Sequence, residues 1–386
     1  MPERSYLLTP GPTPVPPRVA AAMAEPIVHH RSPEFRAVLA RLFRALRDVF
    51  RTENDVILFT TSGSGAMESA VANLCSPGER VLVVSAGHFG ERWATIAGRY
   101  GCDVSHLRYD WGETPSADDV AARLAEIGGA TAVYFTHSET STGVVADVRA
   151  IARAARSAGA VSVVDAISSL GGIPLETDEW GLDVVVAGSQ KALMTPPGLA
   201  LVSVSQSALA AAESATSPRF YLDWTRARDA QGQNPPLNPF TPAISLVRGL
   251  DAAVSLLLQE GLEAAWERAS LLGRACRSGV KAMGLELFSP DEDRSAVVTA
   301  IRVPPRVDGA ALIQSMRERF GVTVAGGQGP LSGAIVRIGH IGYVAIEDVA
   351  AALAALEESL TAQGADVERG QGVLCALEVH AGGARV

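Results

Sequence analysis

Two valine-rich runs, each followed by a charged residue, lie within VSVVDAISSLGGIPLETDEWGLDVVVAGSQK, residues 161–191. Val161–Val164 and Val184–Ala187 are short, continuous and apolar, which is typical of strands buried on both faces of a parallel sheet. Asp165 follows the first run directly, and Lys191 stands just beyond the second. Because burying an unpaired charge costs free energy, both positions are candidates for a functional role.

The same alternation of strand and helix extends to both sides of this stretch. Further strands are predicted at Val56–Phe59, Val81–Val84, Ala132–Phe135 and Leu199–Val204. Helical spacing of apolar residues predicts helices at Ala66–Leu74 and Val148–Ala158, and another from about Ser32. This alternation favours an α/β fold, with a large doubly wound domain built on a mainly parallel sheet.

The pattern changes after about residue 255, where a smaller C-terminal α/β domain is predicted. The predicted elements of this part are the helices Ala243–Gln259, Leu262–Met283, Gly309–Phe320 and Ile346–Leu360, and the strands Val297–Val303 and Ile335–Ile338. The proline-rich first 17 residues should be extended, because proline fixes φ and disfavours helix in the residue before it. We therefore divide the chain into an extended N-terminal segment (1–17), a large domain (18–255), a small domain (256–362) and a tail (363–386). The apolar run Val373–Leu377 in the tail has no predicted role.

Composition excludes several classes of function. The chain has 386 residues, 47% of them hydrophobic, and a formal net charge of −9, so an acidic surface argues against nucleic acid as a partner. It has no apolar run of about 18 residues that would predict a membrane span, and no signal peptide is apparent. Its four cysteines match neither a disulfide framework nor a zinc pattern. We expect a cytoplasmic protein without a metal site.

The turn after the first predicted strand is rich in glycine. Thr60–Glu68 reads TTSGSGAME and leads into a helix, so its backbone could cradle a phosphate at the positive end of that helix. The pattern is neither the GxGxxG fingerprint nor a Walker loop. Taken alone, the signal is weak, because glycine-rich turns before helices are mostly ordinary turns.

Three other strand ends carry polar residues that each have two interpretations. His137–Gly143 can bind a ligand or cap a loop, Asp165 can cap a helix or bind a cationic ring nitrogen, and Lys191 can be a surface lysine or a desolvated nucleophile. Together with the phosphate cradle, they match pyridoxal 5'-phosphate (PLP), which has a phosphate, a pyridine nitrogen and an aldehyde that condenses with an amine. In that case Asp165 keeps the ring nitrogen protonated, and Lys191, 26 residues later (191 − 165), forms the Schiff base.

Several motifs in order resemble the class V aminotransferases of PLP fold type I, in particular the alanine–glyoxylate and serine–pyruvate aminotransferases. The resemblance runs from Pro10–Thr13 to about Gly342. It rests on Gly188–Ala192 with Pro196–Gly198 behind it, and on Ser62–Gly65, His137–Gly143, Val164–Ala166 and Val336–Gly339.

The resemblance implies roles for individual residues. Lys191 would form the Schiff base and move the proton between the substrate and the cofactor, while Asp165 would bind the pyridine nitrogen. Arg337 would bind the substrate α-carboxylate as a bidentate guanidinium. The remaining implied ligands are Ser64, Gly65, Ala66 and Gln190 for the phosphate, Phe89 stacked on the ring, Thr140 for the ring's 3-oxygen region or the substrate, Gly11 for the substrate, and Asn238 and Thr241 reaching from a neighbouring subunit. The sequence departs from many relatives at Phe89, where they have tryptophan or histidine, and near Asn238, where they often have tyrosine.

The function implied is transfer of an amino group from a small amino acid, alanine or serine, to glyoxylate or pyruvate, by a homodimer with shared active sites. Aspartate as donor, a PLP-dependent lyase, and a non-catalytic ligand-binding module stay open as alternatives. A cysteine desulfurase is disfavoured because the loop Gly326–Gly333 has no cysteine. A dicarboxylate donor would need a second cation, for which Arg31, His30 and Arg36 are unplaced candidates; His29, His30 and Arg31 are expected at the subunit contact instead.

Overall fold

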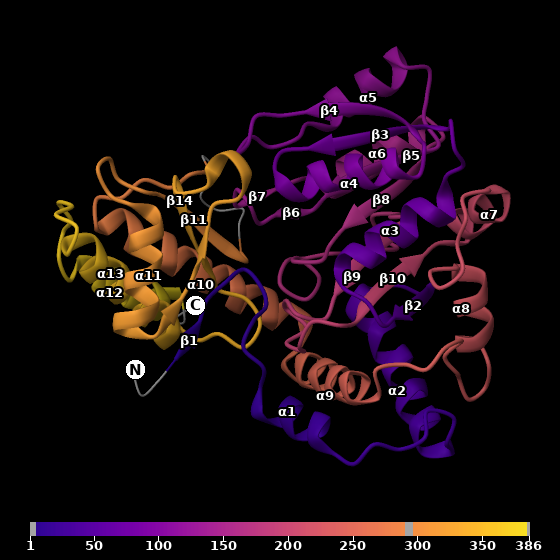
Figure 1. Cartoon of the computed structure of the whole chain (residues 1–386), viewed down its shortest axis with the longest axis horizontal. Helices are drawn as coiled ribbons and strands as arrows, with labels where there is room; N and C mark the ends of the chain where they lie inside the picture. Colours follow the sequence, from indigo (N-terminus) through magenta and orange to yellow (C-terminus); the bar gives the residue numbers. More distant parts are fainter. Residues whose placement is uncertain (1–4, 290–295, 384–386) are drawn as a thin grey trace.

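A seven-stranded sheet forms the centre of the larger part of the molecule (Figure 1). The computed structural model describes residues 5–289 and 296–383. The strand order is β2-β10-β9-β8-β5-β3-β4; β10 is antiparallel to both neighbours and the other pairs are parallel. The predicted α/β fold with a mainly parallel sheet is therefore confirmed. The strands are β2 (Asp55–Phe59), β3 (Arg80–Ser85), β4 (Asp103–Arg108), β5 (Ala132–Thr136), β8 (Val161–Asp165), β9 (Val184–Gly188) and β10 (Ala200–Val204).

Edge strand β4 lies outside the predicted strands. Its sequence DVSHLR lacks the continuous apolar run that identifies the inner strands, because only β3 flanks it and its residues stay partly exposed. The other edge strand, β2, is buried at residues 56–59 and was predicted, so the readable pattern follows burial rather than position in the sheet.

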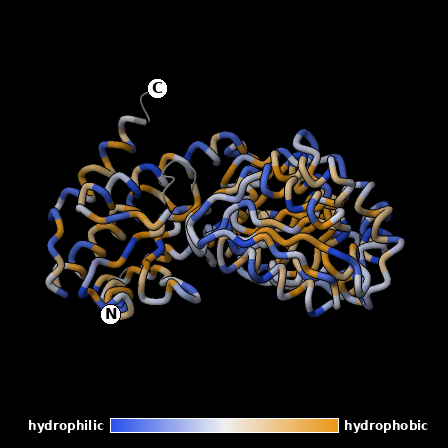
Figure 2. Tube along the Cα trace, turned by 90° about the horizontal axis from the view of Figure 1, so that it is seen from above, coloured by the Kyte–Doolittle hydropathy of each residue, from blue (hydrophilic) through white to orange (hydrophobic). Residues whose placement is uncertain are grey.

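Helices cover both faces of this sheet, since alternate strand residues point to opposite sides. Leu58, Val164 and Val185 pack with one set of helices: α2 (Pro33–Phe50), α5 (Ala117–Glu126), α6 (Val148–Ser157) and α9 (Ile244–Glu260). Ile57, Val163 and Val186 pack with the other: α3 (Gly63–Leu74), α4 (His88–Arg99), α7 (Gln206–Ser214) and α8 (Trp224–Gln231). Figure 2 shows the hydrophobic strands running through the middle of this body.

A second core lies around a three-stranded antiparallel sheet, β11-β14-β13. Its elements are α10 (Leu262–Ala282), β11 (Val298–Arg302), α11 (Gly309–Phe320), β12 (Val322–Thr323), β13 (Ala325–Gly326), a 3-10 turn (Gly329–Leu331), β14 (Ile335–Gly339), α12 (Ile346–Thr361) and α13 (Gln371–Gly383). The N-terminal segment joins this body, because β1 (Tyr6–Leu7) pairs with β12 before α1 (Pro17–Ala24) crosses to α9. The division at residues 17, 255 and 362 remains our proposal.

The tail contains a helix that the sequence did not predict. α13 packs against α10 and α12, burying Ala376 and partly burying Val373 and Val379. This packing accounts for Val373 and Ala376 in the apolar run Val373–Leu377, whereas Leu374 and Leu377 are 51% and 42% exposed. Two short strands, β6 (Ser138–Glu139) and β7 (Val144–Val145), form a hairpin at the end of β5. None of the helices in residues 5–289 and 296–383 has the length and apolarity needed to cross a bilayer.

Candidate active site

The first turn of α3 forms the glycine-rich cradle. A Cβ atom at Gly63 would lie 2.6 Å from Cδ1 of Ile167, and one at Gly65 would collide with the side chain of Thr61, so the backbone here is approached too closely for larger residues. The N–H groups of Gly65 and Ala66 both bond to the carbonyl of Ser62. The N–H groups that precede the first helical bonds are those of Gly63 and Ser64, and these can receive an anion.

Asp165 and Lys191 line one small cavity at the carboxyl ends of β8 and β9. Asp165 is 3% exposed, and its Oδ1 accepts a hydrogen bond from the N–H of Ile167 at 2.9 Å. Lys191 is 8% exposed, and its Nζ donates to the carbonyl of Pro10 at 2.5 Å. Asp165 thus makes the local backbone bond that a cap would make, but it does so buried in the cavity. Lys191 is not a surface lysine, because its amine is buried with it.

Burial shifts the pKa of both groups in the direction that favours their uncharged forms. Desolvation raises the pKa of Asp165 to about 7 and lowers that of Lys191 to about 8. The carboxylate of Asp165 partly opposes the shift of Lys191, and Arg337 and Arg92 add to it. A titratable pair perturbed in this way inside a cavity is typical of a functional site.

Three further predicted residues, Ser64, Phe89 and Gln190, line the same cavity. Gly11 approaches it from the N-terminal segment: its φ is +123°, and a Cβ atom there would lie 2.5 Å from Nζ of Lys191. Gly11 therefore gives the lysine room to extend. The structure brings these residues together from segments far apart in the sequence.

Arg337 and Thr140 meet beside this cavity and do not line it. Nη1 of Arg337 donates to the carbonyl of Thr140 at 2.8 Å, while Nε and Nη2 donate to that of Gly326 at 2.9 and 2.6 Å. Burial lowers the pKa of Arg337 to about 10, and the guanidinium remains cationic at neutral pH. These hydrogen-bond partners are neutral carbonyls, so a carboxylate would be a stronger partner.

Other predicted residues lie apart from the cavity. Ala66 is buried in α3. Asn238 and Thr241 precede Ala243, whose N–H bonds to Oγ1 of Thr60, just past β2, at 3.2 Å. His29 and Arg31 are exposed, and Arg36 bonds to the carbonyls of Pro235 and Pro236. Ala66, Asn238, Thr241, His29, Arg31 and Arg36 are therefore all absent from the lining of the cavity in their own chain.

The structure adds cavity residues that the sequence analysis did not single out. Arg92 donates from Nη1 to Oγ of Ser64 at 2.9 Å, and its guanidinium lies 4.9 Å from the ring centroid of Phe89. Its helical spacing, three residues after Phe89, was an available signal. Ser138, Ile167 and Ser168 also line the cavity.

The residues present fit PLP. Three buried oxygen atoms have no hydrogen-bond partner among the described residues: Oγ of Ser138, Oγ1 of Thr140 and Oε1 of Gln190. Each is available for a hydrogen bond with a ligand. The same cavity holds the carboxylate of Asp165, the amine of Lys191 and the glycine-rich turn of α3, which match the ring nitrogen, the aldehyde and the phosphate of PLP.

Comparisons with known proteins agree with this arrangement. The class V aminotransferase family model matches residues 5–351. The chain is 40% identical to the small subunit of soluble hydrogenase from Synechococcus sp. (strain PCC 6716), over 98% of this chain and 99% of that one, and 38% identical to serine–glyoxylate aminotransferase from Methylorubrum extorquens, over 97% and 96%. The crystal structure of ureidoglycine–glyoxylate aminotransferase from Bacillus subtilis superposes with a TM-score of 0.94 at 32% identity, covering 99% of both chains. The chain therefore belongs to the class V aminotransferases, a PLP-dependent family of fold type I.

Proposed function

We propose that this chain binds PLP and transfers an amino group from a small amino acid, alanine or serine, to glyoxylate, with pyruvate as a second acceptor. The observation that carries the proposal is the pair formed by Lys191 and Asp165, which line one cavity beside the cradle of α3. Glyoxylate is favoured because aminotransferase relatives whose names differ in the donor share this acceptor.

When bound, PLP supplies an electron-withdrawing ring that stabilises negative charge at the substrate Cα. The amine of Lys191 would hold the cofactor covalently and, once released from it, accept and return the Cα proton. The carboxylate of Asp165 would hold the proton on the ring nitrogen; the cationic ring would supply the partner that this buried anion lacks. Phe89 would stack on the ring. The N–H groups of Gly63 and Ser64 and the side chains of Ser64, Gln190 and Arg92 would bind the phosphate, and Gly65 would keep this turn free of a side chain.

Arg337 would bind the substrate α-carboxylate, with Gly11 and Thr140 beside it. A dicarboxylate donor needs a second cation for its distal carboxylate. The cation that lines the cavity in the described part of the chain, besides Lys191, is Arg92, and its bond to Ser64 directs it to the cradle. A small neutral donor is therefore favoured over aspartate.

We further propose a homodimer in which Asn238 and Thr241 complete the phosphate site of the partner. Oδ1 of Asn238 is buried without a partner among the described residues. Beside this segment, Phe220 and Tyr221 are 64% and 39% exposed, and Tyr221 stacks on Phe240. An exposed aromatic cluster of this kind is typical of an interface. A cytoplasmic location also remains a proposal.

The test is a panel of amino donors with glyoxylate or pyruvate as acceptor. We expect kcat/KM for alanine and serine to exceed that for aspartate and glutamate. A hundredfold preference for aspartate or glutamate, about 2.7 kcal/mol of transition-state discrimination, would contradict the small donor and make Arg92 the first cation to substitute. A 2-oxo product formed without consumption of an acceptor would indicate the lyase.

The name of the Synechococcus relative raises the possibility of a hydrogenase subunit. In the described residues no group of three or more His, Cys, Asp or Glu side chains is arranged to hold a metal ion. The specific observation of a perturbed lysine and aspartate in one cavity favours transamination. Dye reduction by hydrogen in the same preparation, without turnover of any amino donor, would reverse this choice.

A further inference from the structure

One buried acid near the candidate site has no role in the proposed chemistry. Glu139 ends β6, is 4% exposed, and makes no ion pair in the part of the chain that the structure describes. An unpaired buried carboxylate is expensive unless several donors satisfy it. Its contacts therefore indicate what it holds in place.

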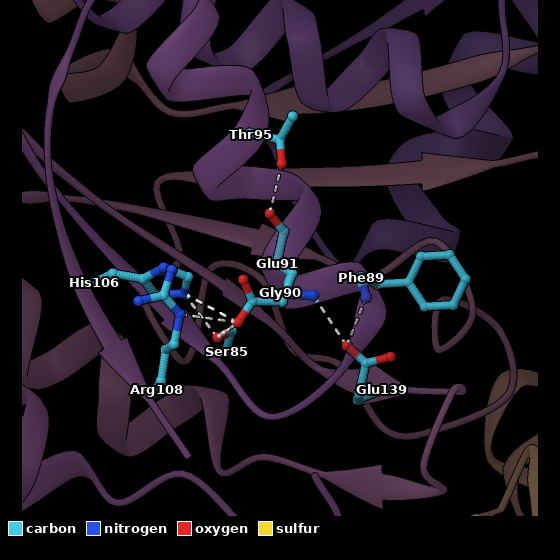
Figure 3. A network of polar contacts seen from close by, with 8 residues as sticks. All are labelled: Ser85, Phe89, Gly90, Glu91, Thr95, His106, Arg108 and Glu139. Carbon is cyan, nitrogen blue, oxygen red and sulfur yellow. Dashed lines mark hydrogen bonds and ion pairs between the residues drawn. The ribbon is translucent and has the colours of Figure 1, made fainter. Parts of the chain in front are cut away.

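Four donors converge on the carboxylate of Glu139. Its Oε2 accepts from the N–H groups of Phe89 and Gly90 at 3.0 and 2.9 Å, which Figure 3 shows. Its Oε1 accepts from the N–H and the hydroxyl of Ser141 at 3.2 and 2.6 Å. Burial raises the pKa of Glu139, and these four donors oppose that shift because they stabilise the ionised acid, which also lies at the positive N-terminal end of α4.

These contacts fix the first turn of α4 against the segment Glu139–Ser141. The N–H of His88 donates to Oγ of Ser141 at 3.0 Å. A Cβ atom at Gly87 would lie 2.5 Å from Oγ of Ser141 and 2.6 Å from Cγ of Glu139, so the two segments are in close contact. Phe89 starts from this turn, and the direction of its ring follows from the position of its backbone.

The same segment also contacts Arg337. The carbonyl of Thr140, the residue after Glu139, accepts from Nη1 of Arg337 at 2.8 Å. We propose that Glu139 is a positioning residue that fixes Phe89 over the cofactor ring and Thr140 beside the substrate-binding Arg337. This inference rests on the proposed PLP-dependent function.

A different acid, which belongs to α4 itself, provides a matched control. Glu91 points away from Glu139 and contacts β3 and β4: its Oε1 accepts from Oγ of Ser85 at 2.9 Å and lies 3.3 Å from Nε of Arg108 (Figure 3). It stabilises the same helix but is absent from the cavity lining. Losing Glu91 therefore tests stability alone.

The test compares Glu139→Gln with Glu91→Gln. In Glu139→Gln the amide oxygen can accept from Phe89 and Gly90, but the NH₂ group then faces the N–H of Ser141, so the set of four bonds cannot be kept.

Each apoprotein is titrated with PLP, and its Tm is measured. The visible circular dichroism of the bound cofactor, which depends on its asymmetric surroundings, is recorded as well. We expect Glu139→Gln to weaken PLP binding about tenfold and to diminish the dichroism, with kcat falling on the order of a hundredfold from misplacement. Glu91→Gln should lower Tm and leave PLP binding and dichroism as in the wild type.

Two outcomes would overturn the inference. One is wild-type dichroism and PLP affinity in Glu139→Gln; the other is a lower Tm with unchanged dichroism, which would make Glu139 a purely structural acid. If Glu139→Gln does not fold, Ser141→Ala, which removes one of the four bonds, should weaken PLP binding about threefold, and an unchanged affinity there would also overturn it. Failure of the wild type to bind PLP would instead overturn the proposed function.

Discussion

At the scale of single residues, the candidate site is built from groups that are costly to bury. Asp165 accepts one backbone hydrogen bond, from Ile167, and Lys191 donates one, to Pro10. Desolvation favours the neutral form of each group: it raises the pKa of Asp165 to about 7 and lowers that of Lys191 to about 8. Such groups persist where function needs them, and a bound cofactor would supply the missing partners.

Asp165→Asn should stabilise the apoprotein and impair the reaction. The folded-state pKa of Asp165 is raised, so the folded protein loses stability as pH rises from about 4 through about 7, and the amide removes this loss. We expect the free energy of unfolding at pH 7 to rise by roughly 1–2 kcal/mol. Cα deprotonation in single-turnover experiments should slow on the order of a hundredfold, with KM little changed. A variant that deprotonates substrate at the wild-type rate, or whose stability keeps the wild-type pH dependence, would contradict the assignment.

At the scale of elements, the inner strands and long helices were predictable because burial on both faces or on one helical face leaves a clear pattern. The strand ends also identified Asp165, Lys191 and the α3 cradle. β4 was not predicted because it is a partly exposed edge strand. α13 was not predicted because its apolar residues are spread around the helix and do not mark one face. Glu139 depends on contacts between the β6 segment and α4, which no local pattern encodes. Arg92 is placed by its bond to Ser64 of α3, and its spacing from Phe89 was the one signal that the sequence offered for it.

Gly65→Ala should destabilise the first turn of α3 and weaken PLP binding. Alanine usually stabilises a helix, but a Cβ atom here collides with Thr61, so we expect a loss of about 1–3 kcal/mol in unfolding free energy and weaker PLP binding. Gly98→Ala, in α4 with no atom within 4 Å of its Cβ position, is the matched control. It should be neutral or stabilise the protein by about 0.4–1 kcal/mol. Calorimetry of both apoproteins measures the difference, and equal effects at the two glycines would show that the cradle is not close-packed.

At the scale of the whole molecule, two bodies contribute to the site. The seven-stranded sheet provides Asp165 and Lys191, the body around β14 provides Arg337, and the N-terminal segment provides Gly11 (Figure 1). Asn238 and Thr241 lie outside their own cavity, which suits a role in a partner's site. The proposed activity therefore depends on how these parts, and two copies of the chain, are held together.

Phe220→Asp should dissociate the proposed dimer. Phe220 is 64% exposed, so the charge costs an isolated chain little, whereas burying it unpaired in an interface is unfavourable. Leu374→Asp on α13, where the leucine is 51% exposed, is the matched control and should remain dimeric. Sedimentation equilibrium with PLP titration checks both variants. A wild type that is monomeric and fully active at nanomolar concentration would contradict the shared site.

The most direct test of the central claim uses the scarcity of lysine in this chain. The sequence contains two lysines, Lys191 in the cavity and the exposed Lys281 on α10. The PLP-loaded protein is reduced with borohydride, digested, and its peptides are identified by mass spectrometry, with Lys191→Ala treated in parallel. The account predicts the cofactor mass on the Lys191 peptide at about one per chain, and none on Lys191→Ala beyond background labelling. A protein that takes up no PLP, or that carries it on Lys281, would contradict it.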